Sequence, residues 1–288
     1  MRVTFCGTRG STPAPGLDYI RFGGNTSCVA LSHDDDGSVL RPTLLLDAGT
    51  GLRRLPGLLG DLPFCGTILL THLHWDHVQG LPFFRSGDRD DAQVHLLLPD
   101  QGDDTDAEAL LARMMSPPFF PIEPSALRGQ WKFGLVPAEA FTAEGFSVLA
   151  LDVPHKGGHT LGFRVSDGHS SVAYIPDHCP TAFGPGPGGI GEYHASALEL
   201  ARDVDLLIHD AHLRAEEVDA EGSFGHAAAE YAVGLGTVAG ARQVALFHHR
   251  PERSDAEVER TVCRFAGGPV PVIGAAEMLT VRLSVLHR

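Results

Sequence analysis

Histidine is frequent in this chain, and one short run concentrates it. The chain has 16 histidines among 288 residues, and the segment THLHWDH at 71–77 brings three of them together with an aspartate. Imidazole and carboxylate groups bind transition metals, and imidazole also carries protons near neutral pH. The segment directly follows an apolar run at 67–71, which predicts a β-strand. A metal site at a strand end is therefore the first expectation.

The spacing within this segment favours two ions over one. Residues two apart at a strand end project to the same side, so His72 and His74 can face one point. Asp76 and His77 follow in the turn and can face a second point. Dinuclear sites hold their ions about 3.5–4 Å apart, which suits so short a segment. A solvated polar turn is the alternative, but nothing structural calls for three histidines and an aspartate there.

Further histidines and aspartates follow later β-rich runs. This recurrence is typical of a site along one edge of stacked sheets. The candidates are His155, His159, Asp177, His178, His209, Asp210, His212, His226, His248 and His249.

The positioning elements are predicted to form one layered α/β domain over residues 1–288, with mixed sheets. Strands come in groups with helices between and after them, which argues against a strictly alternating fold. We expect strands at 2–6, 27–32, 43–47, 67–71, 93–98, 145–153, 161–166, 171–175, 205–209, 243–248 and 279–286. We expect helices at 104–115, 194–203, 227–239 and 254–265. Within 100–131, a possible insertion, the segment SPPFFPIEP at 116–124 is predicted to be a lid or a subunit contact, so a homodimer is one expectation.

Composition excludes several classes of protein. Lys plus Arg is 22 and Asp plus Glu is 36, so the net charge is −14, which disfavours binding to long nucleic acid. No apolar run approaches the roughly 20 residues of a membrane span. The five cysteines are scattered without a CxxC pair, so neither a disulfide framework nor a four-cysteine zinc site is expected. No secretory signal is seen at the start, and a cytoplasmic location is expected.

The HxHxDH motif, together with the later His and Asp groups, resembles the metallo-β-lactamase fold superfamily. The order of the groups is most similar to its phosphodiesterase branch, which includes ribonuclease Z. The resemblance also covers segments 5–11, 23–27 and 46–51. It implies a four-layer αββα sandwich, in which two mixed β-sheets are flanked by helices.

The resemblance also implies a set of metal ligands. His72, His74 and His155 would hold one ion, Asp76, His77 and His248 a second, and Asp177 would bridge them. His159 competes with His155, which ends an apolar run and precedes the glycine pair. His249 competes with His248, and His178 is expected to contact the site from outside or to touch substrate. Asp47 would fix the motif loop through hydrogen bonds. Zinc is expected, with manganese or iron as alternatives.

A catalytic group is implied beside the metals. His226 resembles the helix-opening histidine of the ribonuclease Z branch, although Ala227 stands where that branch usually has Ser. A helix-terminal residue near solvent is the alternative for His226. Asp210 would position His226, and Asp76 or water would relay a proton. Metal-activated water would attack phosphorus, which predicts a dinuclear phosphodiesterase.

The expected substrates of this chain are only some of those that the family hydrolyses. Ribonuclease Z enzymes carry a tRNA-binding arm between the third metal motif and the bridging aspartate, but here only about twenty residues separate His155 from Asp177. A small phosphodiester or nucleotide is therefore expected, of the cyclic nucleotide or cyclic ribose phosphate type. The alternatives are a ribonuclease Z-like RNA-processing nuclease or a lactamase, lactonase or thioesterase of the same fold. A flavodiiron-like oxidoreductase would need a flavin domain, for which no residues are left. A non-enzymatic member of the fold would have lost metal ligands of the motif.

Overall fold

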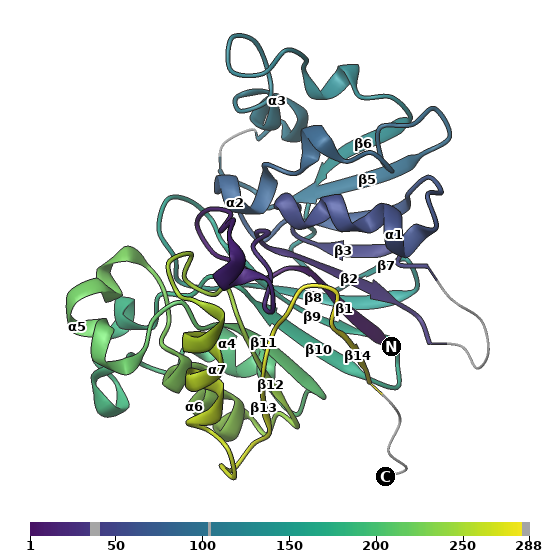
Figure 1. The fold of residues 1–288 in the computed structure, drawn as a ribbon. Coiled ribbons are helices and arrows are strands. Elements are labelled where there is room, and N and C mark those ends of the chain that lie inside the picture. The colour runs from purple at the N-terminus through teal and green to yellow at the C-terminus, as the bar shows by residue number, and fades with distance from the viewer. Residues whose placement is uncertain (35–40, 103–104, 284–288) are drawn as a thin grey trace.

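Two seven-stranded β-sheets form the centre of the computed structural model (Figure 1), which describes residues 1–34, 41–102 and 105–283. The first sheet has the order β14-β1-β2-β3-β4-β5-β6. Its strands are β1 (Arg2–Gly7), β2 (Cys28–Ser32), β3 (Leu44–Leu46), β4 (Cys65–Leu69), β5 (Gln93–Leu98), β6 (Gln130–Leu135) and β14 (Thr280–Arg282). Strands β3 to β6 are parallel, whereas β14, β1, β2 and β3 are antiparallel neighbours, so the sheet is mixed.

The second sheet has the order β13-β12-β11-β10-β9-β8-β7. Its strands are β7 (Phe141–Ala143), β8 (Phe146–Asp152), β9 (Leu161–Ser166), β10 (Ser171–Ile175), β11 (Leu206–Asp210), β12 (Val244–Phe247) and β13 (Val272–Gly274). Strands β10 to β13 are parallel and β7 to β10 are antiparallel. Both sheets therefore combine a parallel half with an antiparallel half.

Three apolar layers hold the sheets and helices together. Between the sheets, Phe5 and Leu46 of the first pack in one cluster with Phe146 and Phe247 of the second. The outer faces are covered by helices α1 (Leu55–Leu59), α2 (Trp75–Val78) and α3 (Ala107–Ala112) on one side, and by α4 (Ala195–Ala201), α5 (Val218–Glu221), α6 (Ala229–Ala239) and α7 (Asp255–Cys263) toward the other. The predicted αββα sandwich is confirmed.

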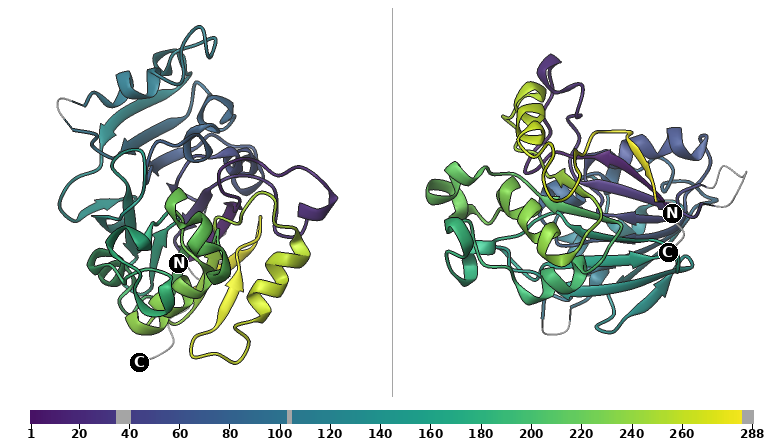
Figure 2. Two further views of the ribbon diagram at one scale, coloured as in Figure 1. Left: turned by 90° about the vertical axis from the view of Figure 1, so that its left-hand side faces the viewer. Right: turned by 90° about the horizontal axis from the view of Figure 1, so that it is seen from below.

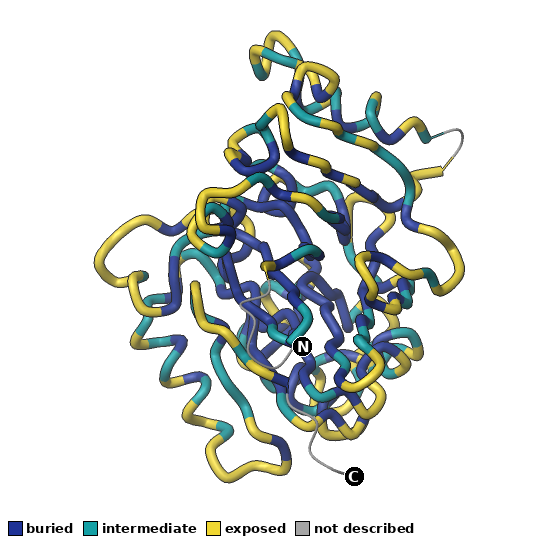
Figure 3. Tube along the Cα trace, turned by 90° about the vertical axis from the view of Figure 1, so that its right-hand side faces the viewer, coloured by how far each residue is buried: buried dark blue, intermediate teal, exposed yellow. Residues whose placement is uncertain are grey.

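The views agree on this layering. In the left view of Figure 2, α3 lies at one end of the molecule and α6 and α7 lie at the other. Figure 3 shows the buried chain gathered in the middle and the exposed chain in the outer loops. No helix of the described ranges is long and apolar enough to cross a bilayer.

Most predicted elements are found, with shorter bounds. Helix α7 begins with a capping box, in which the Ser254 backbone N–H donates to Glu257 at 2.9 Å. The helix predicted at 104–115 is shorter, as α3, and residue 104 lies outside the described residues. The strand predicted at 279–286 is β14, and 284–286 lie outside the described residues. Strands β6, β7 and β13 and helices α1, α2 and α5 were not predicted.

The topology brings polar strand ends to one edge. Parallel strands end on the same side of a sheet, where ligands of α/β proteins bind. Asp47 follows β3, and the 71–77 segment follows β4. In the second sheet, Asp177 follows β10 and His248 follows β12. Candidate residues from both sheets are thereby brought together at one edge of the sandwich.

Candidate metal centre

The 71–77 segment turns from strand β4 into the short helix α2. His74 has extended backbone angles at the helix N-cap, and Asp76 and His77 lie in the first turn. His72 therefore precedes the helix while His77 lies within it. This turn lets the four polar side chains of the motif face two different points, as the spacing predicts.

The first group of potential ligands contains His72, His74, His155 and Asp177, whose ligand atoms all lie within 4.8 Å of one another. Oδ2 of Asp177 is 3.7 Å from Nε2 of His72 and 3.4 Å from Nε2 of His155. Nε2 of His155 is 3.3 Å from Nδ1 of His74. Three imidazoles and one carboxylate oxygen thus surround one point.

The second group contains Asp76, His77 and His248. Oδ2 of Asp76 lies 3.3 Å from Nε2 of His77 and 3.0 Å from Nε2 of His248. Oδ1 of Asp177 lies 3.0 Å and 3.1 Å from the same two nitrogens. The two oxygens of Asp177 therefore face different groups, which is the placement expected of a bridging carboxylate.

Several of these inward-facing atoms are buried without a hydrogen-bond partner among the described residues. They include Nε2 of His72, Nε2 of His77 and Oδ1 of Asp177. An unsatisfied buried polar atom costs roughly 1–3 kcal/mol. Divalent cations would satisfy all of these atoms together, and a donor set of imidazole and carboxylate without thiolate suits zinc, manganese or iron. The residues present therefore fit metal ions.

Electrostatics prepare the histidines of the first group for coordination. Burial lowers the pKa of His72, His74 and His155 below the usual range. Neutral imidazole is the form that binds a metal, so protons do not compete with the ion near neutral pH.

Asp47 fixes the geometry of the motif from behind. Its Oδ1 accepts from the Thr71 backbone N–H at 2.7 Å, and its Oδ2 accepts from Nδ1 of His77 at 2.8 Å. The Tyr174 hydroxyl donates to Oδ2 at 2.8 Å. With Nδ1 of His77 occupied in this way, Nε2 is left to point into the cluster. These are the loop-fixing bonds that the family resemblance implies for Asp47.

The structure separates each pair of competing histidines. His159 lies outside the cluster, half-exposed, with its ring paired to Asp152 and its Nδ1 donating to the Asp100 carbonyl at 2.8 Å. His249 is buried with Nε2 donating to the Ala275 carbonyl at 2.9 Å. His155 belongs to the first ligand group, and His248 belongs to the second. His178 is fully buried against His209, so it cannot touch substrate.

A second polar unit adjoins the metal ligands. Oδ2 of Asp210, at the end of β11, accepts from Nδ1 of His226 at 3.1 Å. The same oxygen accepts from the backbone N–H of Ala227 at 3.1 Å. Burial disfavours protonation of His226, but Asp210 outweighs it and raises the pKa of His226 to about 9. Nδ1 of His226 lies 3.9 Å from Oδ2 of Asp177, so in the metal-free protein an imidazolium adjoins the cluster.

Sequence reasoning gave His212 no role, yet its ring is part of this unit. It stacks on His226 with centroids 4.2 Å apart and planes 18° apart. The backbone N–H of His212 donates to Oδ1 of Asp210 at 2.9 Å. Burial and His226 lower the pKa of His212 to about 3, so this ring is neutral. The HDAH spacing at 209–212 was the only available signal.

A family model described as a beta-lactamase superfamily domain matches residues 43–249. The chain belongs to the beta-lactamase superfamily. It is similar to ribonuclease Z of Natronomonas pharaonis, with 24% identity over 94% of this chain and 90% of that protein. Ribonuclease Z of Haloarcula marismortui is 23% identical over 86% of each chain.

Solved structures of the superfamily share the fold. The metallo-beta-lactamase fold protein YhfI from Bacillus subtilis has a TM-score of 0.67 at 18% identity, covering 97% of this chain and 98% of its own. The short form of human tRNase Z has a TM-score of 0.65 at 20% identity, covering 99% of this chain and 100% of its own. A diphosphatase of the PhnP family has a TM-score of 0.63 at 19% identity, covering 99% of this chain and 98% of its own.

In this member of the superfamily, the cluster opens into a cavity of about 390 Å³, here called the metal cavity. Its walls bring both ligand groups and the His226 unit to one space. They are formed by Ser11, Leu73, His74, Trp75, Asp76, His155, Asp177, Phe224 and His226. The Ser11 backbone N–H donates to Oδ2 of Asp76 at 2.7 Å, a contact that the sequence does not reveal.

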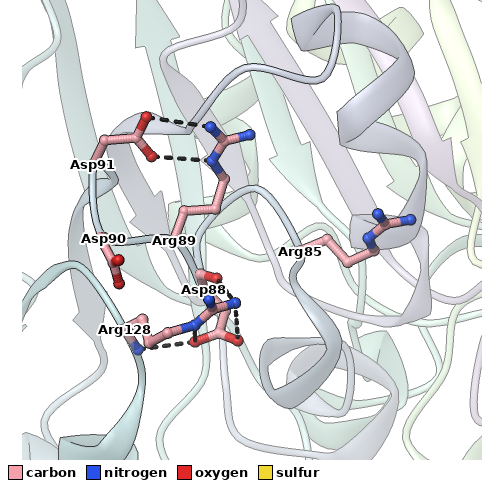
Figure 4. Close-up of a pocket in the computed structure, with 6 residues that line it drawn as sticks. All are labelled: Arg85, Asp88, Arg89, Asp90, Asp91 and Arg128. Atoms are coloured by element: carbon pink, nitrogen blue, oxygen red, sulfur yellow. Dashed lines mark hydrogen bonds and ion pairs between the residues drawn. The ribbon is translucent and has the colours of Figure 1, made fainter.

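Another hollow, shown in Figure 4, contains none of the predicted site residues. It is lined by Arg85, Asp88, Arg89, Asp90, Asp91 and Arg128. Arg89 pairs with Asp91 at 3.0 Å and Arg128 with Asp88 at 3.2 Å. Much of its charge is therefore neutralised within the hollow, and the metal cavity is the better candidate for chemistry.

Proposed function

We propose that this member of the beta-lactamase superfamily is a metal-dependent phosphodiesterase that hydrolyses small phosphodiesters. The observation that carries the proposal is the Asp210–His226 pair beside the ligand cluster. A cationic donor at this place suits the negative oxygens of a phosphodiester and the charge that develops on them. A lactam or a thioester carries no such negative charge before it reacts.

The ligand groups would hold two divalent ions. His72, His74 and His155 would bind one, Asp76, His77 and His248 the other, and Asp177 both. Ions bound there would supply Lewis acidity and lower the pKa of a water molecule.

The chain's own groups would orient the reaction and move protons. His226 bonds Asp210 through Nδ1, so Nε2 is free to donate to a phosphoryl or leaving-group oxygen. Burial disfavours ionisation of Asp76, but His77 and His248 hold its pKa well below the usual range, so it is a carboxylate. It would accept the hydrogen bond of the attacking water. The Ser11 backbone N–H would keep Asp76 in position.

An RNA-processing nuclease is the second candidate, favoured by the two ribonuclease Z relatives. Two observations favour a small substrate over tRNA. Strands β9 and β10 occupy the interval between His155 and Asp177, with only residues 167–170 joining them, so no arm emerges there. The net charge of −14 also opposes binding to a long polyanion.

Assays on the zinc-loaded protein test the proposal. We expect hydrolysis of bis(p-nitrophenyl) phosphate and none of nitrocefin or a simple lactone. His226→Ala should keep its metals and lose about 100-fold or more in kcat, the usual contribution of a general acid. His169→Ala, on an exposed turn, serves as the matched control. Turnover of nitrocefin but not of the diester would contradict the proposal, and efficient release of a tRNA 3′ trailer would favour the second candidate.

A further inference from the structure

Three of the most exposed aromatic side chains lie close to the metal cavity. Trp75 is 74% exposed, Phe83 is 67% exposed and Phe119 is 83% exposed. Single exposed apolar residues are ordinary on protein surfaces, but a contiguous group marks a binding site. Phe83 and Phe120 also contact each other edge to face, with centroids 5.7 Å apart.

These side chains line one hollow of about 450 Å³, here called the aromatic groove. One wall comes from the motif helix and the turn after it, and the other from the end of α3 and the 116–124 segment. The lining residues are Trp75, Gln79, Pro82, Phe83, Arg113, Met114, Phe119 and Phe120. The 116–124 segment thus forms a wall of a groove beside the metal centre.

Trp75 joins the aromatic groove to the metal cavity, because its side chain lines both. It stands between His74 and Asp76, one from each ligand group. A ligand with its phosphate in the metal cavity would therefore extend over the indole of Trp75 into the groove. The groove is placed to bind whatever is attached to that phosphate.

The chemistry of the lining selects the attached group. Aromatic side chains favour a flat ring, and any nucleobase can stack on them because every base has a π-face. Arg113 adds a guanidinium that has no ion pair within the part of the chain that the structure describes. Its N–H groups can stack on a ring or bond the acceptors at its edge. A sugar without a base would have no flat ring to stack on the aromatic side chains. An alkyl chain would have no acceptor for the N–H groups of Arg113.

We propose that the aromatic groove binds the nucleobase of a nucleotide whose phosphate lies in the metal cavity. The inference rests on the proposed function and narrows its substrate to nucleoside phosphodiesters. The base stacks against Trp75 and Phe119, and Arg113 faces the base from the same groove.

Binding to the zinc-loaded protein tests this assignment without catalysis. The probes are AMP, ribose 5-phosphate and inorganic phosphate, each titrated by calorimetry. AMP should bind about 5- to 150-fold more tightly than ribose 5-phosphate, the range that one stacked base contributes. In a Trp131→Phe variant, Trp75 is the only tryptophan, since the chain has two. AMP should quench its fluorescence, and ribose 5-phosphate should not.

Variants locate the base. Trp75→Ala and Phe119→Ala should bring the affinity for AMP toward that for ribose 5-phosphate. Both positions are exposed, so the fold should be retained, which thermal unfolding checks. Phe183→Ala is the matched control, because Phe183 is 61% exposed and lines neither hollow. It should leave the preference for AMP unchanged.

Other outcomes would separate the base site from the proposed function. Equal affinity for AMP and ribose 5-phosphate, with bis(p-nitrophenyl) phosphate still hydrolysed, would refute the base site and leave the proposed function standing. AMP preference without any diester hydrolysis would retain the base site and refute the phosphodiesterase. A dimer that Phe119→Ala dissociates, with no preference for AMP, would show that a second copy of the chain covers the groove.

Discussion

Asp47 accepts a hydrogen bond from Nδ1 of His77 at 2.8 Å, and neither side chain is exposed. This contact decides which nitrogen of His77 faces the ligand cluster. The same contact ties the end of β3 to helix α2, which carries half of the HxHxDH motif. Asp47 also accepts from the Thr71 backbone N–H, so it holds the start of the motif segment as well. The proposed metal centre thus depends on a residue that would not touch the metal.

Asp47→Asn tests this dependence with almost no change of shape. The amide can no longer accept both from His77 and from Thr71 as the carboxylate does, so His77 should lose its fixed orientation. Loss of such an outer contact typically lowers metal affinity about 10- to 100-fold. Competition with a chelating dye measures this affinity. Asp219→Asn, at an exposed position of α5, is the control, and equal affinity in both variants would contradict the role of Asp47.

His155→Ala and His159→Ala form a matched pair only four residues apart. Only His155 belongs to the first ligand group. We expect elemental analysis to find about one ion fewer per chain in His155→Ala, together with loss of diester hydrolysis. His159→Ala should keep both ions, because its ring pairs with Asp152 outside the cluster. The reverse pattern would reassign the ligand.

Gly10 lies against His248, and a side chain there should disturb the second ligand group. A Cβ at position 10 would be 2.3 Å from Nδ1 of His248, which is itself fully buried and cannot move aside freely. Gly10→Ala should therefore lower the metal content and the melting temperature together. Gly57→Ala, in helix α1 where a Cβ would meet nothing within 4 Å, should lower neither. A Gly10→Ala protein with full metal content would show that the ring of His248 adapts.

The pKa of His226, about 9 in the metal-free protein, predicts a pH dependence of stability. The folded-state pKa lies above the ordinary value of 6.5, so the stabilisation is complete below pH 6.5. It is lost as the pH rises toward 9. The difference between 9 and 6.5 corresponds to about 3 kcal/mol. Urea unfolding of the metal-free protein should show this decline, and His226→Gln should make it shallower; parallel curves for the two proteins would refute the assignment.

The strands that carry the candidate ligands were easier to predict than the other elements. Ligands such as Asp177 and His248 follow apolar runs, and a residue at a strand end is easily recognised beside such a run. Strand β6, with the sequence QWKFGL, has no clear alternation and contains a glycine. Strands β7 and β13 have three residues each, and α2 has four, which is too short for any periodicity to appear.

Features that depend on distant segments were beyond sequence reasoning. Trp75 and Phe119 lie 44 positions apart, and only the path of the chain through β5 and α3 brings them to one groove. The stacking of His212 on His226 depends likewise on how the chain returns from α5. Side chains of the right type were visible in the sequence, but their contacts were not.

A crystal grown with excess zinc, with data collected at the zinc absorption edge, would test the central claim most directly. We expect two anomalous peaks, one among His72, His74, His155 and Oδ2 of Asp177, and one among Asp76, His77, His248 and Oδ1 of Asp177. The peaks should be about 3.5–4 Å apart. A single peak, or two peaks that Asp177 does not join, would contradict the dinuclear centre.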